Sequence, residues 1–216
     1  GGTYRLWAAC QAEPGDRFVC YLESADCQTW TQPSLGQIDF QGSRENNLVR
    51  VGNNPTVFKD PHGPAEERYK AMWQTECDAA QFQKLRGQRP WSHFAYRADD
   101  KPVYCVRAAV SPDGLKWTDL PEPISYETSD THIVCYFDAL LRKYVLYTRS
   151  YQIGPRAGGF PPSQAGRSSF LPRRTIGRSE SENFRAFPLS QSIIEPASDM
   201  LPSDTLYTNC RTVIPG

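Results

Sequence analysis

Hydrophobic and polar positions alternate with a period of two along most of the chain, in short runs separated by clusters of Gly, Pro, Asn and Asp. This pattern predicts β-strands joined by turns, and helical periodicity is weak. The 18 proline residues further disfavour long helices. The sequence therefore predicts an all-β fold.

One arrangement of strands and turn residues occurs three times. Each copy has two short β-like runs followed by Ser-x-Asp/Asn-x-x-x-Trp/Phe, a motif that we call the box. The boxes begin at Ser24, Ser111 and Ser181, so their serines lie 87 and 70 residues apart. Self-similarity on this scale indicates a repeat architecture. We expect the polar side chains of each box to hold its turn by hydrogen bonds to the backbone, and its aromatic residue to pack between sheets.

The second and third copies extend upstream. Asn54 and Asp130 each begin a run that leads through a turn containing Asp60 or Asp138 to the next tyrosine-containing run. A full repeat thus has four strands, A to D, with strand D after the box. Four antiparallel strands in a repeat of this length are typical of a β-propeller blade.

The repeats divide the chain into a first blade without strand A (1–53), two full blades (54–125 and 126–199) and the start of a fourth (200–216). The segments 74–101 and 151–172 interrupt the pattern as insertions between strands B and C. So few blades do not close a ring, and open edge strands are a liability. We therefore expect an incomplete propeller, with two full four-stranded antiparallel blades plus parts of two more, in a chain that is a fragment of a longer protein.

The composition indicates which classes of partner the chain can bind. The chain has 24 basic and 24 acidic residues and no charge run, which argues against nucleic acid or an anionic membrane as the main partner. No run of 18 apolar residues and no signal peptide is present. The 12% aromatic content suits a protein that binds sugars, although β-sheets favour aromatic residues in any case.

The seven cysteines show no Cys-x-x-Cys motif and no Cys/His cluster at metal-binding spacing, so neither a metal site nor a cofactor is predicted. Cys20, Cys105 and Cys135 lie inside apolar strand runs and are interpreted as small buried hydrophobic residues. A disulfide between Cys10 and Cys20, on neighbouring strands, is the alternative for Cys20.

The blade order, the box from Ser111 to Trp117 (Ser-Pro-Asp-Gly-Leu-Lys-Trp) and an aspartate at the head of strand A together resemble five-bladed propeller glycoside hydrolases of families 32 and 43. The stretch from Pro33 to Gly36, followed by 40–43 and 46–47, resembles uncharacterised bacterial members of this group. The resemblance implies an incomplete five-bladed β-propeller, a carbohydrate substrate and a secreted or periplasmic location. It also implies glycosidase activity at the central pocket of the propeller.

The resemblance also implies the catalytic residues. In these families, carboxylates at the inner ends of the blades supply the acid and base that glycoside hydrolysis needs. At the heads of strand A this maps to Asp130 and Asp204 as the candidate catalytic residues. Asn54 holds the same position in the second blade, where its amide could only hydrogen-bond a substrate. The first-blade position would precede Gly1.

Four further residues are expected near the same end of the blades. His132 alternates onto one face of its strand and could line the channel, although a lone histidine is more often structural. Arg149 and Trp73 are expected to end strand B, where Arg149 could pair with a carboxylate and Trp73 could stack on a sugar. A surface salt bridge and core packing are the respective alternatives. Arg174 begins strand C on the same side.

Two other carboxylates invite a catalytic interpretation but fit structural roles better. Lys59-Asp60-Pro61 looks like the Arg-Asp-Pro motif of family 32, yet Asp60 matches Asp138 at the A–B turn, where aspartate is ordinary. Glu180 lies directly before a box, on the connection between strands C and D, which is the face away from a propeller's ligand site.

Three functions remain open from the sequence. The first is a glycoside hydrolase that uses carboxylate acid/base catalysis. The second is a non-catalytic propeller that binds glycans or proteins, because fold alone does not confer activity. The third is a sialidase-type propeller, which would need a set of arginines around a substrate carboxylate.

Overall fold

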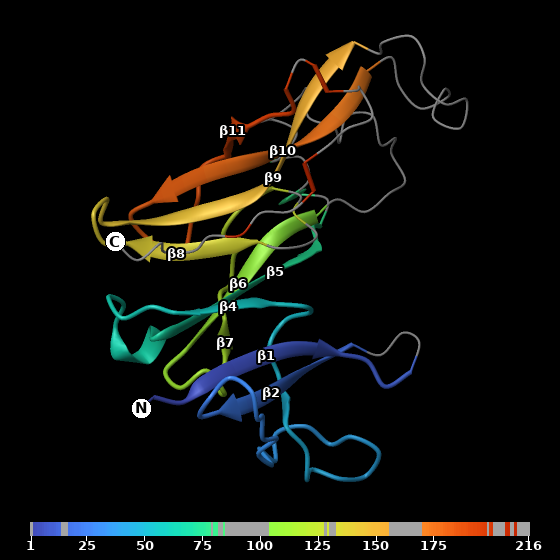
Figure 1. Cartoon of the computed structure of the whole chain (residues 1–216), viewed down its shortest axis with the longest axis vertical. Helices are drawn as coiled ribbons and strands as arrows, with labels where there is room; N and C mark the ends of the chain where they lie inside the picture. Colours follow the sequence, from blue (N-terminus) through green and yellow to red (C-terminus); the bar gives the residue numbers. More distant parts are fainter. Residues whose placement is uncertain are drawn as a thin grey trace. The chain divides into compact units, whose positions relative to one another are not determined.

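The structure is a computed structural model, and it is all-β. It describes residues 2–13, 17–78, 80–81, 84, 104–127, 129, 133–155, 170–197, 199–200, 206–207 and 210. The strands of these residues form three antiparallel sheets, of three, four and four strands (Figure 1). This confirms the predicted antiparallel all-β fold, and within the described ranges none of the three sheets closes on itself.

The first sheet has the order β1-β2-β3. Its strands are β1 (Tyr4–Cys10), β2 (Phe18–Ser24) and β3 (Leu48–Val49). Alternate residues of β2 are buried, including Val19 at 2% and Tyr21 at 1% exposure, as the period-two pattern predicts. Three strands are what a repeat without its strand A should form.

The second sheet has the order β4-β5-β6-β7. It comprises β4 (Thr56–Lys59), the 3-10 turn η1 (Ala65–Glu67), β5 (Tyr69–Glu76), β6 (Tyr104–Ser111) and β7 (Thr118–Asp119). The expected last strand, 118–125, is broken after two residues, and the chain rejoins β6 through the bridge between Ser125 and Val106. Pro121 and Pro123 explain the break, because proline cannot donate a ladder hydrogen bond.

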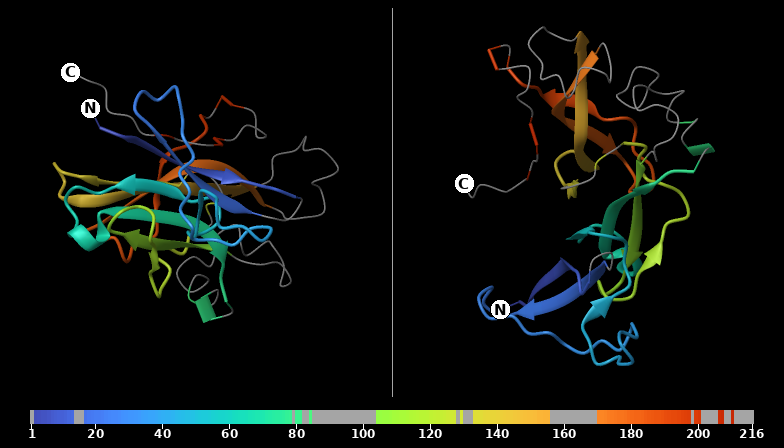
Figure 2. Two further views of the ribbon diagram at one scale, coloured as in Figure 1. Left: turned by 90° about the horizontal axis from the view of Figure 1, so that it is seen from below. Right: turned by 90° about the vertical axis from the view of Figure 1, so that its right-hand side faces the viewer.

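The third sheet has the order β11-β10-β9-β8. Its strands are β8 (Val134–Asp138), β9 (Lys143–Pro155), β10 (Phe170–Ser181) and β11 (Gln191–Ile194). β9 and β10 lie side by side over their whole length, from Tyr144 opposite Ser181 to Pro155 opposite Phe170 (Figures 1 and 2). The expected insertion 151–172 is therefore strand at both of its ends, because the two strands continue to pair there.

All three boxes form the predicted turn. In the first, the backbone N–H groups of Gln28 and Thr29 both donate to Asp26 Oδ1 at 2.8 Å. In the second, Leu115 and Lys116 donate to Asp113 Oδ1 at 2.8 and 2.9 Å. In the third, Arg185 and Ala186 donate to Asn183 Oδ1 at 2.9 and 3.1 Å. The repeat identified in the sequence is therefore also a repeat of local structure.

The hydrogen bonds of the box change its acidity. The pKa of the Asp26 carboxyl falls from 3.8 to about 2, because the N–H groups of Thr29 and Gln28 stabilise its charged form. At Asp113, partial burial raises the pKa, but the N–H groups of Lys116 and Leu115 outweigh it and the net shift is downward. Asn183 has no charge to stabilise, so the third turn uses the same geometry without a carboxylate.

The described chain packs as two compact units, Gly1–Trp73 with Arg107–Glu122 and Gln74–Val106 with Pro123–Gly216. The core of the first unit gathers seven buried residues from β2, β3, β5, β6 and the segment after β3: Val19, Tyr21, Val49, Val51, Ala71, Trp73 and Ala109. Trp117, the aromatic residue of the second box, packs against this core as predicted.

Strand β1 is attached to the second box within the same unit. Trp7 Nε1 donates to the carbonyl of Gly114 at 2.8 Å, and Arg5 Nη1 donates to the carbonyl of Asp113 at 2.7 Å. Gly114 has a φ of +79°, and a Cβ there would lie 2.7 Å from the Trp7 ring. Glycine is required at this position both for its left-handed backbone and for the close approach of the indole.

The cysteine prediction needs one correction. Cys10 and Cys20 form a disulfide, with their Cα atoms 6.2 Å apart, so Cys20 is not simply a small buried hydrophobic residue. The pairing register of β1 and β2 places Cys20 opposite Ala8, two residues from Cys10 on the same face. Cys105 and Cys135 are buried, at 0% and 4% exposure, as predicted.

Candidate functional site

The predicted site residues fall into three groups. Asp130, His132 and Asp204 lie outside the described residues, so their predicted roles rest on the sequence. Asn54 and Trp73 lie in the first unit, and Arg149 and Arg174 lie in the second.

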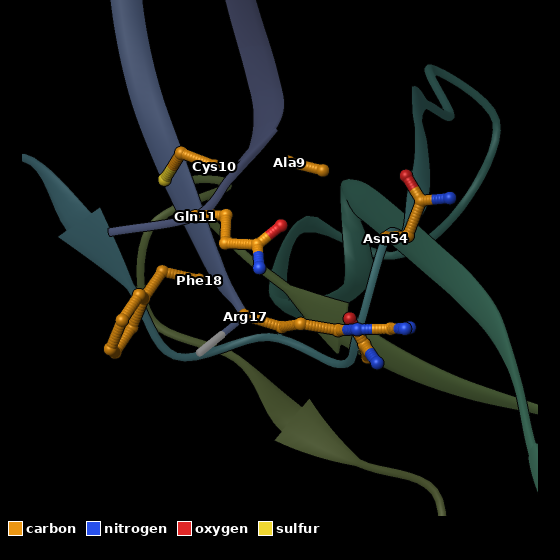
Figure 3. Close-up of a pocket in the computed structure, with 7 residues that line it drawn as sticks. Ala9, Cys10, Gln11, Arg17, Phe18 and Asn54 are labelled. Carbon is orange, nitrogen blue, oxygen red and sulfur yellow. The ribbon is translucent and has the colours of Figure 1, made fainter. Parts of the chain in front are cut away.

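Asn54 lines a pocket of about 290 Å³ in the first unit (Figure 3). The pocket lies where β1 ends, β2 begins and the chain approaches β4. It is lined by Ala9, Cys10, Gln11, Arg17, Phe18, Asn53 and Asn54. Figure 3 shows the Arg17 side chain extended below Gln11 toward the segment that carries Asn54. The lining therefore combines one guanidinium with three side-chain amides.

The backbone before β4 explains why Asn54 stands at the pocket. Asn54 has a φ of +54°, and Gly52 has a φ of +34°. Asparagine and glycine are the residues that adopt this left-handed conformation most readily. The turn leaves the Asn54 side chain exposed, and its amide can both donate and accept hydrogen bonds.

Trp73 belongs to the core. It is 8% exposed and packs with Ala71, Val51 and the other residues of the first unit's core. The backbone of Gly52 lies close against the indole, so a Cβ at Gly52 would collide with the Trp73 ring. Trp73 also lies inside β5, which runs on to Glu76, and does not end the strand. The core-packing alternative therefore accounts for Trp73, which offers a sugar little surface for stacking.

Arg149 is 6% exposed and lies in the interior of β9, not at its end as the sequence predicts. Its backbone N–H donates to Ser129 Oγ at 3.1 Å. The correction has a physical reason: β9 keeps pairing with β10 as far as Pro155, beyond the part of β9 that pairs with β8. Arg149 thus lies two residues past the last rung shared with β8.

Arg149 and Arg174 meet at one aromatic ring. The Cζ atoms of Arg149 and Arg174 lie 5.5 and 4.9 Å from the centroid of the Tyr207 ring. The N–H of Leu206 donates to the carbonyl of Arg174 at 3.1 Å, which holds Leu206 against β10. The structure therefore brings together the two arginines that the sequence placed in the site.

A buried polar cluster beside Arg149 was not predicted. Glu127 is 3% exposed, and its Oε1 accepts hydrogen bonds from the backbone N–H and the hydroxyl of Ser190, at 2.7 and 2.9 Å. Ser190 Oγ in turn accepts a hydrogen bond from Thr148 Oγ1 at 3.1 Å. No spacing in the sequence links Glu127 to residues 63 positions away, because the link forms only when β10 and the segment after it pack against β9.

Asp60 has the structural role that the repeat predicts. It is fully buried, pairs with Lys70 Nζ at 2.8 Å and accepts a hydrogen bond from the N–H of His62 at 3.0 Å. At the matching turn, Asp138 accepts hydrogen bonds from Leu140 and Leu141 at 3.0 Å. Both aspartates therefore hold the turn between strands A and B.

Glu180 lines a second pocket, of about 480 Å³, between β10 and β11. Its carboxylate is paired with Arg178 at 2.8 Å and lies 3.6 Å from Lys143 Nζ. These contacts place Glu180 in an ion pair on β10, which agrees with the structural role that the repeat predicts for it.

In the part of the chain that the structure describes, no helix is long and apolar enough to cross a membrane. In the same residues, no group of three or more His, Cys, Asp and Glu side chains is arranged to hold a metal ion.

Three further candidate site residues, Gln11, Arg17 and Tyr207, were not predicted from the sequence. Gln11 and Arg17 flank the connection from β1 to β2, which is the B–C connection of the first repeat and thus equivalent to the position of 151–172. That equivalence is the feature of the sequence that could have indicated Gln11 and Arg17. Tyr207 follows Asp204 by three residues in the same predicted strand, but no sequence pattern links it to the arginines.

No family model matches the chain, and no curated protein or solved structure is significantly similar to it.

Proposed function

We propose that this chain is part of a β-propeller that binds a carbohydrate and hydrolyses its glycosidic bonds. The observation that carries the proposal is the pocket around Asn54, which is the predicted head of strand A in the second repeat. The two four-stranded antiparallel meanders and the three equivalent box turns support a propeller, because a propeller is built from repeated sheets of this kind.

The chemistry of the pocket suits a sugar. Gln11, Asn53 and Asn54 carry amides, which both donate and accept hydrogen bonds, and Arg17 carries five N–H donors. Sugar hydroxyls likewise donate and accept, so such a lining can satisfy several hydroxyls at once. The Phe18 ring packs edge-on against Phe40, at a centroid distance of 5.2 Å, and makes one wall of the pocket rigid and apolar.

In this proposal Asp130 and Asp204 supply the catalysis. Glycoside hydrolysis needs one carboxylic acid to protonate the leaving oxygen and a second carboxylate to activate water or attack the sugar. Asp130 follows Ser129, which is 0% exposed and whose hydroxyl oxygen accepts a hydrogen bond from the Arg149 N–H on β9.

The test compares carboxylate variants with a matched aspartate. The purified protein is screened for released reducing sugar on neutral and acidic polysaccharides and aryl glycosides. We expect Asp130→Asn and Asp204→Asn each to lower kcat by about 10²–10⁴-fold, the usual contribution of an acid or base. Asp138→Asn, at an exposed turn, is the control and should leave kcat unchanged. Full activity in both site variants would refute the catalytic assignment.

A non-catalytic glycan-binding propeller is the second candidate, and one observation favours it. The pocket around Asn54 is lined, among the described residues, by amides and arginine with no carboxylate. If this candidate is right, Asn54→Ala and Arg17→Gln should weaken sugar binding in calorimetry while no substrate is hydrolysed. Binding without turnover would thus separate the two functions.

A further inference from the structure

We propose that the outer edge of β1 binds an extended peptide segment, which adds a fourth strand to the first sheet. The sequence pattern of this segment is a small apolar residue, an aromatic residue, any residue and then an aspartate. Another part of the propeller to which this chain is proposed to belong supplies the segment. The inference therefore rests on the propeller in the proposed function, but not on the proposed catalysis.

The other two sheets show what pairs with the equivalent edge. Tyr4 lies opposite Ser24, the first residue of its box. Tyr144 lies opposite Ser181, the first residue of the third box, so β1 is equivalent to β9. The outer edge of β9 pairs with β8, and that of β5 pairs with β4, both antiparallel. In the first sheet, by contrast, β1 pairs only with β2 among the described residues.

The apolar side chains of β1 are exposed where their equivalents are buried. Tyr4 is 52% exposed and Leu6 is 41% exposed. Their equivalents in β9 are Tyr144 and Leu146, which are 8% and 0% exposed. An added strand would bury part of this apolar surface and would pair with the backbone of β1, which is how sheets bind extended peptides.

The two strands that already occupy this position share a sequence pattern. In both, a small apolar residue, an aromatic residue and a third residue are followed by aspartate, at 57–60 and at 135–138. The aromatic residues, Phe58 and Tyr136, lie opposite the position that Arg5 occupies in β1. We expect the segment that binds β1 to follow the same pattern, because it would meet the same register.

Arg5 provides a charge complementary to the aspartate of the pattern. Its equivalent in β5 is Lys70, whose Nζ lies 2.8 Å from Asp60 Oδ2. Arg5 Nη1 donates to the Tyr69 hydroxyl and to the carbonyl of Asp113. Within the described ranges, the other nitrogen atoms of the guanidinium make no hydrogen bond, and Arg5 forms no salt bridge. These remaining donors suit a carboxylate.

The experiment titrates the purified chain into a fluorescent synthetic peptide with the sequence of residues 53–61. An Asp60→Asn version of the peptide and a shuffled sequence are the control peptides. Fluorescence anisotropy measures binding, and hydrogen exchange detected by mass spectrometry locates it. The protein variants are Arg5→Gln, Arg5→Lys and the control Arg50→Gln, which changes another exposed arginine. Thermal unfolding confirms that each variant is folded.

We expect the peptide to bind and to slow amide exchange in β1. It should leave exchange unchanged in β11, an edge strand of another sheet with two exposed isoleucines. Arg5→Gln and the Asp60→Asn peptide should each weaken binding by about two- to fivefold. Combined, they should weaken it no further, because both changes remove the same ion pair. Arg5→Lys should retain most of the affinity, and Arg50→Gln should retain all of it.

Several results would overturn the inference. Failure of the peptide to bind, or equal binding of the shuffled peptide, would refute strand addition. Slower exchange in β11 in place of β1 would refute the site, and additive losses from Arg5→Gln and the Asp60→Asn peptide would refute the ion pair. A dimer that protects β1 without any peptide would show that a second copy occupies the edge instead.

These outcomes are independent of the sugar assay. A chain that binds the peptide but hydrolyses no sugar would support strand addition and refute the proposed catalysis. A chain that hydrolyses sugar but does not bind the peptide would do the reverse.

Discussion

The two four-stranded sheets have the same strand order and the same box turn, but they differ at the position after the first tyrosine of strand B. In the β4–β7 sheet this residue is Lys70, which pairs with the buried Asp60. In the β8–β11 sheet it is Val145, which is 0% exposed. The registers agree, since Phe58 lies opposite Lys70 and Tyr136 lies opposite Val145. One scaffold thus accepts either a buried ion pair or an apolar side chain at the same place.

The comparison separates the aspartate that both A–B turns require from the lysine partner that only the β4–β7 sheet has. Both turns keep an aspartate, Asp60 or Asp138, that accepts backbone hydrogen bonds. Only the first also buries that aspartate with a lysine partner, which is 1% exposed. A buried ion pair is costly to desolvate, so it contributes little net stability, yet breaking it leaves an uncompensated charge.

The largest expected effect comes from breaking this pair. Lys70→Met should lower the free energy of unfolding by about 3–5 kcal/mol, because Asp60 would keep a buried charge without its lysine. The double variant Asp60→Asn with Lys70→Val, which imitates the other sheet, should be less destabilised than Lys70→Met. Urea unfolding measures both. A Lys70→Met variant within about 1 kcal/mol of the unchanged protein would contradict this account of the pair.

The next largest effect concerns the disulfide between Cys10 and Cys20 in the first sheet. The described residues of the β8–β11 sheet form no disulfide. Replacing Cys10 and Cys20 with alanine should cost about 2–3 kcal/mol, because the unfolded chain would regain the freedom of a short loop. Cys27→Ala, at an exposed cysteine, is the control. Adding reductant to the unchanged protein should reproduce the loss. Equal unfolding midpoints with and without reductant would argue against the bridge.

A smaller effect should separate the boxes. Asp113→Ala removes the acceptor of two backbone N–H groups, one of them on the partly buried Leu115, and should cost about 1–3 kcal/mol. Asp26→Ala removes the same bonds at an exposed turn, where water replaces them, and should cost less. Thermal unfolding of the two variants would rank them. The opposite order would mean that burial does not determine how much each box contributes to the stability of the protein.

The smallest effect is the pH dependence of the two carboxylate boxes. The pKa values of Asp26 and Asp113 are lowered in the folded protein, so the folded state binds fewer protons than the unfolded state near pH 3. Their contribution is complete above about pH 4–5 and is lost as the pH falls toward about 2. The box of the third repeat, with Asn183, contributes no such term.

Asp113→Asn tests this sign directly. It should reduce the loss of stability between pH 5 and pH 2, measured by urea unfolding at a series of pH values. Asn183→Asp is the reciprocal variant and should add a term of the same sign to the third repeat. An unchanged pH profile in both variants would show that the box carboxylates do not contribute to acid unfolding.

Much of the fold could be predicted because its signals are local. The alternating runs, the turn aspartates and the Ser-x-Asp/Asn motif each act over a few residues, so the strands, the A–B turns and the box geometry followed from the sequence. The exact ends of β9 and β10 did not, because 151–155 and 170–172 pair through a partner strand and not through their own composition. Strand β7 is shorter than the sequence predicts, because the two prolines that follow it cannot donate ladder hydrogen bonds.

The site was less predictable, since it depends on distant residues. Their positions in the repeat make Asn54 and Arg174 candidates, and the structure places Asn54 at a pocket and Arg174 beside Tyr207. Trp73 was misplaced because an aromatic residue near a strand end suits both a core and a sugar site, and only the packing of Gly52 against its ring decides between them.

The sequence by itself determined the repeat, the strand order within each copy and the role of each box, because backbone hydrogen bonding and side-chain alternation act at short range. The tertiary structure alone decided that Lys70 is buried with Asp60 and that Glu127 reaches Ser190. It alone decided that Arg149, Arg174 and Tyr207 meet. These contacts join residues far apart in the chain. Their energies depend on burial and on the distance between charges, and both quantities exist only once the sheets have packed.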